Sequence, residues 1–185
     1  MDRTARSIVF SIFGVLGVST LAFVVSVIVP YQVNQTATIE DITGAAEIVR
    51  DQDTRATLVP DDSEKLRIGE TVRVEPGNAA SVVFFNQGRA VLTGPAAITL
   101  VESYQKATTL GHMVDSSQFK RRYGLTIKQM HGTVQYYFDH SDPAFEAMTI
   151  KVQLPNGSYQ PDSPCWQITI SADQTITPET LSCPD

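Results

Sequence analysis

Residues 148–157 read Met-Thr-Ile-Lys-Val-Gln-Leu-Pro-Asn-Gly, and they indicate the fold class of this 185-residue chain. Apolar side chains at every second position alternate with polar ones. This is the period of a β-strand that has one face in a core and the other in water. The Pro-Asn-Gly that follows is typical of a tight turn. The stretch therefore predicts a strand followed by a hairpin.

The same period recurs along the chain. Residues 134–138 and 166–170 also alternate between apolar and polar side chains. Residues 82–85 and 97–101 are instead apolar on both faces, which predicts central strands that are covered on both sides. Strands at short, regular intervals favour an antiparallel β-sandwich or roll over alternating strands and helices. The fold predicted is mainly β, with one N-terminal transmembrane α-helix before it.

Turn residues punctuate these strands. Hairpin signals separate strand-like runs at four places, namely residues 75–78, 86–88, 93–95 and 155–157. Two stretches lack a strand pattern, residues 51–65 and 113–122. We expect both to be loops, with room for a helical turn.

The N-terminal segment is distinct from this β pattern. Residues 7–29 read SIVFSIFGVLGVSTLAFVVSVIV and contain no charge over 23 residues. As a helix the segment would be about 35 Å long, enough to cross a hydrocarbon core of about 30 Å. Pro30 marks its end. The sequence predicts a single-pass signal-anchor over residues 7–30, preceded by a short cytoplasmic tail over residues 1–6.

A cleaved signal peptide is the main alternative for this segment. Arg3 and Arg6 would serve as its positive region, but its apolar part usually has about 7–15 residues, which is shorter than this run. The two arginines on one side of the segment, against Glu40 and Asp41 on the other, place the N-terminus in the cytoplasm. We therefore expect an uncleaved anchor and an extracytoplasmic C-terminal domain in the cell membrane.

Beyond the anchor, the sequence predicts a linker over residues 31–43, a β domain over residues 44–171 and a C-terminal tail over residues 172–185. Cys165 and Cys183 are the only cysteines, and both lie on the side of the membrane where oxidation is permitted. We expect them to form a disulfide that ties the tail to the last core strand. It closes a loop of about 19 residues, worth on the order of 3 kcal/mol.

Charge and motif content exclude several classes of function. Without Asp2, Arg3 and Arg6 the chain has a net charge of −7, which disfavours nucleic-acid binding. Its three histidines have no metal-ligand spacing, so neither a metal nor another cofactor is expected. Residues 139–141, Asp-His-Ser, hold an acid, a base and a nucleophile, but adjacent residues on one loop rarely converge. The sequence thus predicts no enzyme and no catalytic residue.

A longer pattern runs through the outer part of the chain. Its first half consists of Leu-Arg-Ile-Gly-Glu-Thr-Val-Arg-Val at residues 66–74, Asn-Ala-Ala-Ser-Val-Val-Phe-Phe at 78–85, Gly-Arg-Ala-Val-Leu at 88–92 and Pro-Ala-Ala-Ile-Thr-Leu at 95–100. Its second half has a strand–glycine–strand step at residues 125–134 and a final strand and turn at 145–157. Together they resemble the FecR-type domain over roughly residues 44–171.

The resemblance implies a module on a single-pass anchor that senses or binds another component of the bacterial cell envelope. The best-known members also control a sigma factor through a cytoplasmic region, but only about six residues precede the anchor here. Residues 158–164 depart from the family's usual Arg-Gly-Thr step. The expected function is therefore a non-enzymatic sensing or protein-binding module.

Two alternatives stay open. In the first, the chain is a structural or assembly subunit of the envelope and associates with itself through its β domain. In the second, it is an extracytoplasmic enzyme that uses Asp139, His140 and Ser141. Neither the ligand, the partner nor the oligomeric state follows from the sequence, although a membrane-protein or envelope-protein partner is expected.

Overall fold

The computed structural model of the chain describes residues 31–50, 54–85, 88–107, 122–139 and 148–183. These residues form thirteen strands and no helix, which confirms the prediction of a mainly β fold. The strands are β1 (Tyr31–Asn34), β2 (Ala37–Thr43), β3 (Ala46–Arg50), β4 (Thr54–Leu58), β5 (Glu64–Leu66), β6 (Thr71–Val74), β7 (Ala79–Val83), β8 (Arg89–Ala107), β9 (Arg122–Tyr137), β10 (Met148–Leu154), β11 (Gly157–Tyr159), β12 (Cys165–Ile170) and β13 (Ile176–Thr180).

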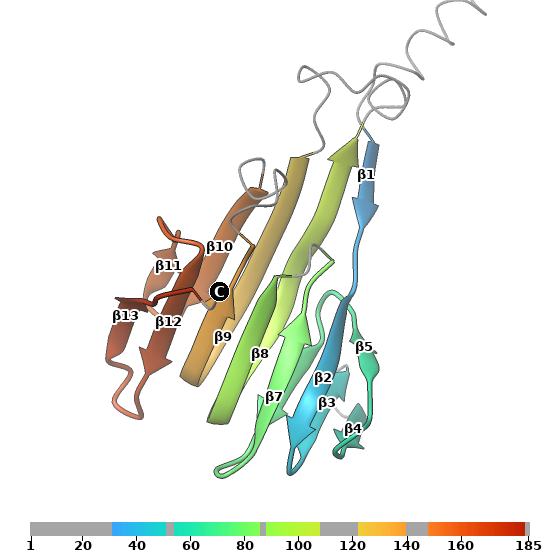
Figure 1. The fold of residues 1–185 in the computed structure, drawn as a ribbon, viewed down its shortest axis with the longest axis vertical. Coiled ribbons are helices and arrows are strands. Elements are labelled where there is room, and N and C mark those ends of the chain that lie inside the picture. Colours follow the sequence, from blue (N-terminus) through green and yellow to red (C-terminus); the bar gives the residue numbers. More distant parts are fainter. Residues whose placement is uncertain (1–30, 51–53, 86–87, 108–121, 140–147, 184–185) are drawn as a thin grey trace, which may run out of the picture. The chain divides into compact units, whose positions relative to one another are not determined.

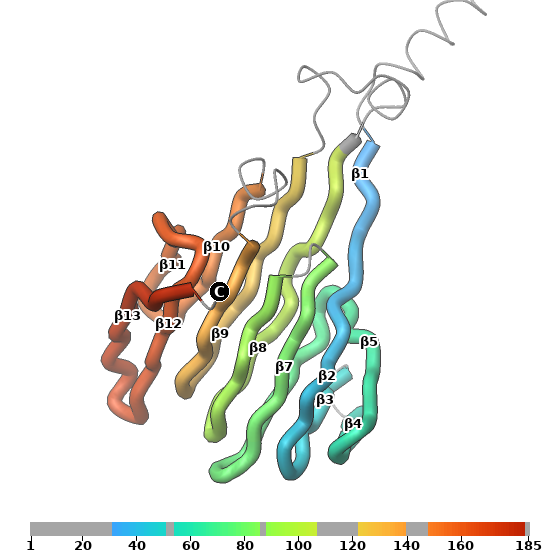
Figure 2. Tube along the Cα trace, viewed as in Figure 1, coloured from blue at the N-terminus to red at the C-terminus, as the bar shows by residue number. Residues whose placement is uncertain are grey.

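Two long strands, β8 and β9, organise the others. The N-terminal part of β8 pairs with β7 through residues 89–93, and a later part pairs with β6 through residues 96–99. In β9, residues 123–128 pair with β10, whereas residues 132–137 pair with β12. Each long strand therefore bends and runs in two layers, as Figure 1 shows. The tube in Figure 2 follows both strands down one layer and back up the other.

The two bends lie against each other. Gly132 in β9 has a φ of 85°, and a Cβ at this position would overlap the Pro95 carbonyl oxygen and Ala96. In β8 the bend occurs at Gly94-Pro95, a cis peptide bond. A Cβ on Gly94 would overlap the backbone carbonyl of Glu75. Only glycine can therefore occupy these two positions without moving the neighbouring backbone.

A single hydrophobic core fills the space between the layers. Its members come from most of the strands. Fully buried examples are Ile39, Ile48, Leu92, Ile127 and Ile168. Four aromatic rings stack in a row through this core, with centroid separations of 6.1 Å, 5.3 Å and 5.1 Å along Phe84, Phe138, Trp166 and Tyr136.

One polar side chain is fully buried beside the bend of β9. Gln129 Nε2 donates hydrogen bonds to the carbonyl oxygens of Gly132 and Ile168, each at 2.9 Å. Its Oε1 accepts a hydrogen bond from the Tyr136 hydroxyl at 3.1 Å, and burial raises the pKa of this phenol. The amide thus uses both donors and an acceptor, and joins the two arms of β9 to β12.

Three predictions about the strands need correction. The sheet is mixed rather than antiparallel, because β9 and β10 run parallel. Residues 93–95 form a bend inside β8 instead of a turn between two strands. Residues 75–78 join β6 to β7, which pair with other strands and not with each other, so this turn is no hairpin. The Pro155-Asn156 turn does join the paired strands β10 and β11.

Two predicted boundaries and one burial pattern are also wrong. Residues 37–43 of the predicted linker form β2, whose Ile39 is buried, and residues 51–65 of the predicted loop contain β4 and the start of β5. Both stretches had too few apolar side chains to show the strand period. Val83 and Val101 are half-buried, so the strands that carry them are not covered fully on both faces.

The predicted anchor lies outside the described residues, as do residues 113–121 of the second predicted loop. Among the residues that the structure describes, no helix has the length and apolarity needed to cross a bilayer.

Candidate functional site: a neutral polar face that ends in a pocket

Five uncharged polar side chains lie in a row on the outer face of β9 and β12. Alternation along both strands buries Val134, Tyr136, Trp166 and Ile168 and turns the intervening side chains outward. We call the outward set the neutral ladder, and it consists of Thr133, Gln135, Tyr137, Gln167 and Thr169. All five are half-buried.

Hydrogen bonds join the members of the neutral ladder across the two strands. Thr133 lies opposite Thr169, and their hydroxyl oxygens are 3.1 Å apart. Gln135 lies opposite Gln167, and its Nε2 donates to Gln167 Oε1 at 2.9 Å. The Tyr137 hydroxyl donates to Gln135 Oε1 at 3.0 Å. These bonds hold the two threonines against each other and tie Gln135, Gln167 and Tyr137 into a second group.

The C-terminal segment closes one end of the neutral ladder. Cys165 lies opposite Tyr137 in the register of β9 and β12 and points to the same outer face as Gln167 and Thr169. It is nevertheless buried, because Cys183 bonds to it and brings the segment after β13 across β12. Figure 1 shows this red segment passing in front of β12 towards β9. The predicted disulfide is thus present, with a Cα–Cα distance of 5.4 Å.

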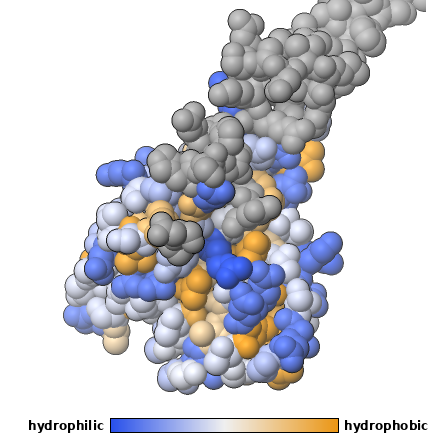
Figure 3. All heavy atoms as spheres, viewed as in Figure 1, coloured by the Kyte–Doolittle hydropathy of each residue, from blue (hydrophilic) through white to orange (hydrophobic). Residues whose placement is uncertain are grey.

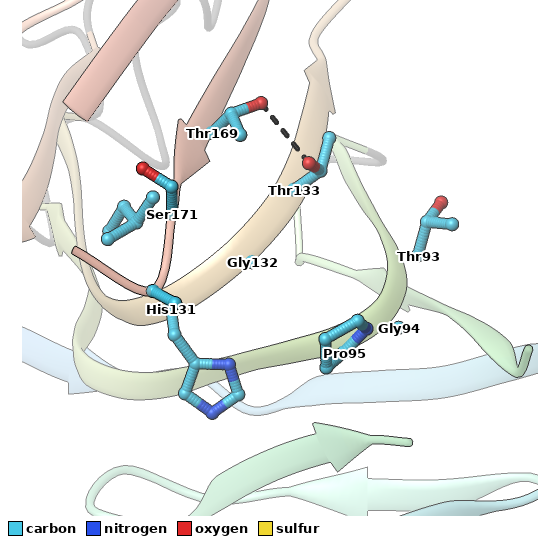
Figure 4. A pocket seen from close by; sticks show the side chains of 10 residues that line it. Thr93, Gly94, Pro95, His131, Gly132, Thr133, Thr169 and Ser171 are labelled. Atoms are coloured by element: carbon cyan, nitrogen blue, oxygen red, sulfur yellow. Dashed lines mark hydrogen bonds between the residues drawn. The ribbon is translucent and has the colours of Figure 1, made fainter. Parts of the chain in front are cut away.

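A pocket of about 520 Å³ lies at the other end of the ladder, where β8 and β9 bend. It is lined by Thr93, Gly94, Pro95, His131, Gly132, Thr133, Thr169, Ile170, Ser171 and Ala172. Figure 4 shows the Thr133–Thr169 hydrogen bond on one side of this pocket and the His131 ring at its rim. None of the lining residues carries a carboxylate, ammonium or guanidinium group. The pocket therefore presents hydroxyl groups, backbone and one imidazole, that of His131, to a ligand.

The serine that lines the pocket is held by the turn that follows β12. Ser171 Oγ lies 2.6 Å from Asp173 Oδ1, a hydrogen bond that, together with two from Thr175, lowers the pKa of the Asp173 carboxyl. The Ser171 hydroxyl donates to this carboxylate and to the Thr175 carbonyl oxygen. These bonds hold the serine in the wall of the pocket.

The ladder keeps hydrogen-bonding capacity for a ligand. Each threonine hydroxyl has one proton, and one bond between Thr133 and Thr169 uses only one of the two. Gln167 accepts through Oε1, which leaves both protons of its Nε2 for a ligand. The Tyr137 ring adds a rigid, half-apolar surface beside these donors.

The outer face of β3, β4 and β6 is different. Glu47, Arg55 and Arg73 project from it, and we call these three side chains the charged face. Glu47 and Arg55 form an ion pair at 3.5 Å, with the Arg55 side chain 61% exposed. Arg73 lines a shallow hollow of about 230 Å³ together with Glu75, and its Nε has no hydrogen-bond partner. Counted with Glu75, the face carries two acidic and two basic groups.

Exposed apolar surface is sparse in the part of the chain that the structure describes. Its exposed large apolar side chains are Tyr31, Val33, Val59 and Ile68. Figure 3 shows apolar spheres interspersed with polar ones on the face in view. Tyr31 and Val33 belong to β1, whereas Val59 and Ile68 follow β4 and β5.

The structure places only some of the sequence-predicted residues. Asp139 is exposed after β9, whereas His140 and Ser141 lie outside the described residues. Within those residues no three His, Cys, Asp or Glu side chains gather as metal ligands. The neutral ladder was missed, because the alternation assigned its residues only to solvent. The like-for-like pairs Thr133–Thr169 and Gln135–Gln167 become visible once the strands are paired.

Comparison with protein families, with characterised proteins and with solved structures finds no match to this chain.

Proposed function

We propose that the chain is a non-enzymatic binding or sensing module of the FecR type, held by one N-terminal helix at the outer face of a bacterial cytoplasmic membrane. One observation carries the proposal. An uncharged run of 23 residues precedes a strand-built domain closed by a disulfide. Such a bond persists in oxidising compartments and is rare in the cytosol. The partner is another component of the envelope.

Protease accessibility and thiol state test this location together. In spheroplasts that express the full chain with a C-terminal tag, added protease should remove the tag, and both cysteines should resist alkylation until they are reduced. The matched control is the double variant Val15→Arg, Val18→Arg, because each central arginine costs about 2.5–3.5 kcal/mol on insertion. Its tag should be protected and its thiols free. A protected tag or free thiols in the unmodified chain would contradict the proposal.

Self-association through the β domain is a second candidate, favoured by β4. In the described part of the chain β4 pairs only with β3, and its sequence Thr-Arg-Ala-Thr-Leu contains one charge and no proline. Such an edge can pair with another strand. Sedimentation of the full chain in detergent separates the candidates. A monomer supports the first, and an oligomer that Thr57→Lys dissociates supports the second.

A further inference from the structure

We infer that the neutral ladder and its pocket bind an uncharged glycan chain of the cell wall. The inference rests on the proposed location outside the cytoplasmic membrane, where such a polymer is at hand. The site combines fixed hydroxyl and amide groups, one aromatic ring and a pocket, all on one face of β9 and β12.

The chemistry of the site matches that of a glycan better than that of other ligands. Sugar hydroxyls and acetamido groups both donate and accept hydrogen bonds, as the hydroxyls and amides of Thr133, Thr169 and Gln167 do. The apolar face of a sugar ring can lie on the Tyr137 ring, whose hydroxyl is already engaged by Gln135. The site has no lysine or arginine to neutralise a phosphate-rich polymer.

The dimensions of the site also suit a chain. Side chains on one face of a strand repeat about every 7 Å. The cross-strand pairs Thr133–Thr169, Gln135–Gln167 and Tyr137–Cys165, together with the pocket, therefore form an extended track that is longer than one sugar ring. The disulfide segment closes the track beside Tyr137, and the pocket beside Thr133 opens the other end. A glycan would lie along β9 and β12 and place one sugar in the pocket.

The bonds within the ladder reduce the entropy that binding costs. Long polar side chains normally lose about 0.5–1.5 kcal/mol each when a ligand immobilises them. Gln135 and Gln167 are already held by each other, and Gln135 is also held by Tyr137. They therefore present their remaining donors without further ordering.

The test uses the full chain in a polyoxyethylene detergent, because the headgroup of a maltoside would compete for the site. Calorimetry measures binding of the N-acetylglucosamine tetramer, and co-sedimentation measures binding to purified, protein-free wall sacculi. We expect binding to both, at least tenfold weaker in Gln167→Ala and in Tyr137→Ala. The matched control is Gln153→Ala on β10, which should leave binding unchanged. Because the site is neutral, affinity should change less than twofold between 0.05 and 0.5 M salt.

Three results would overturn the inference. One is a lack of binding by the folded chain at millimolar tetramer. Another is binding that persists in both ladder variants while their unfolding curves match that of the unmodified chain. The third is capture of a protein partner that depends on Gln167 in place of the glycan. None of these results bears on the protease and alkylation assay, so the location of the domain is tested separately.

Discussion

Two outer faces of the fold, both built from β-strands, differ in charge. The face of β9 and β12 carries the neutral ladder, whereas the face of β3, β4 and β6 carries the charged face. The neutral ladder is tied together by hydrogen bonds of 2.9–3.1 Å, and it lies over the buried Gln129 and the bend at Gly132. On the charged face, one ion pair is 3.5 Å long and Arg73 Nε has no partner. A surface held by backbone geometry and a covalent bond keeps its shape in salt, whereas one held by exposed charges does not.

The largest effect should come from the bend beneath the ladder. Gly132→Ala places a Cβ on the Pro95 carbonyl oxygen in a backbone with positive φ, so we expect a loss of more than about 4 kcal/mol, or no folding. Urea unfolding followed by the fluorescence of Trp166, the single tryptophan, measures it. Gly69→Ala is the control, because its φ is 91° but no atom lies near its Cβ. It should lose only about 1–2 kcal/mol.

The buried amide below the ladder comes next. Gln129→Leu leaves the carbonyl oxygens of Gly132 and Ile168 and the hydroxyl of Tyr136 without their partner, so a loss of about 3–4 kcal/mol is expected from the same unfolding measurement. The exposed Gln160→Leu provides the comparison and should cost under about 0.5 kcal/mol. Equal losses in the two variants would show that the ladder does not depend on this network.

The covalent bond at the end of the ladder should have the third-largest effect. Replacing both cysteines, Cys165→Ser with Cys183→Ser, opens the loop that the disulfide closes. The two cysteines are 18 positions apart in the sequence. The unfolding free energy should fall by about 3 kcal/mol. Limited proteolysis should then remove the C-terminus while the remaining strands stay intact. If the double variant is as stable as the unmodified chain, the disulfide contributes nothing to this face.

The smallest effect should come from the charged face. Arg55→Gln breaks the exposed ion pair with Glu47 and should cost under about 0.5 kcal/mol, an amount that disappears at 0.5 M salt. Thr133→Val on the neutral ladder removes one hydroxyl bond and should cost about 1 kcal/mol at either salt concentration. If both costs responded to salt alike, the contrast between the two faces would be wrong.

The sequence predicts the strands whose burial alternates and fails where the chain bends. The period at residues 148–154 and 166–170 marks β10 and β12, because one buried face is enough to produce it. The Gly94-Pro95 step looks the same in sequence as a turn between two strands. The pairing of β8 first with β7 and then with β6 shows that it continues into a second layer, and Gly132 lies against Pro95 at the bend. That contact joins residues far apart in the chain and leaves no local signal.

The candidate site was still harder to predict, because its residues are ordinary ones. Threonine and glutamine at outward positions of a strand are typical of a solvated surface. They become a ladder only through the antiparallel register of β9 and β12, which sets Thr133 opposite Thr169 and Gln135 opposite Gln167. The disulfide was predictable, since two cysteines allow one intramolecular pairing.

The length of β8 separates the pocket from the first strands of the described chain. Gln35 N donates to the Ser103 carbonyl oxygen near one end of β8, and the pocket lies at the bend of that strand, at Pro95. Eight residues of extended backbone separate the two points, a contour of about 26 Å. A ligand held in the pocket is thus set apart by this arm of β8 from Gln35, where the chain enters its longer strands.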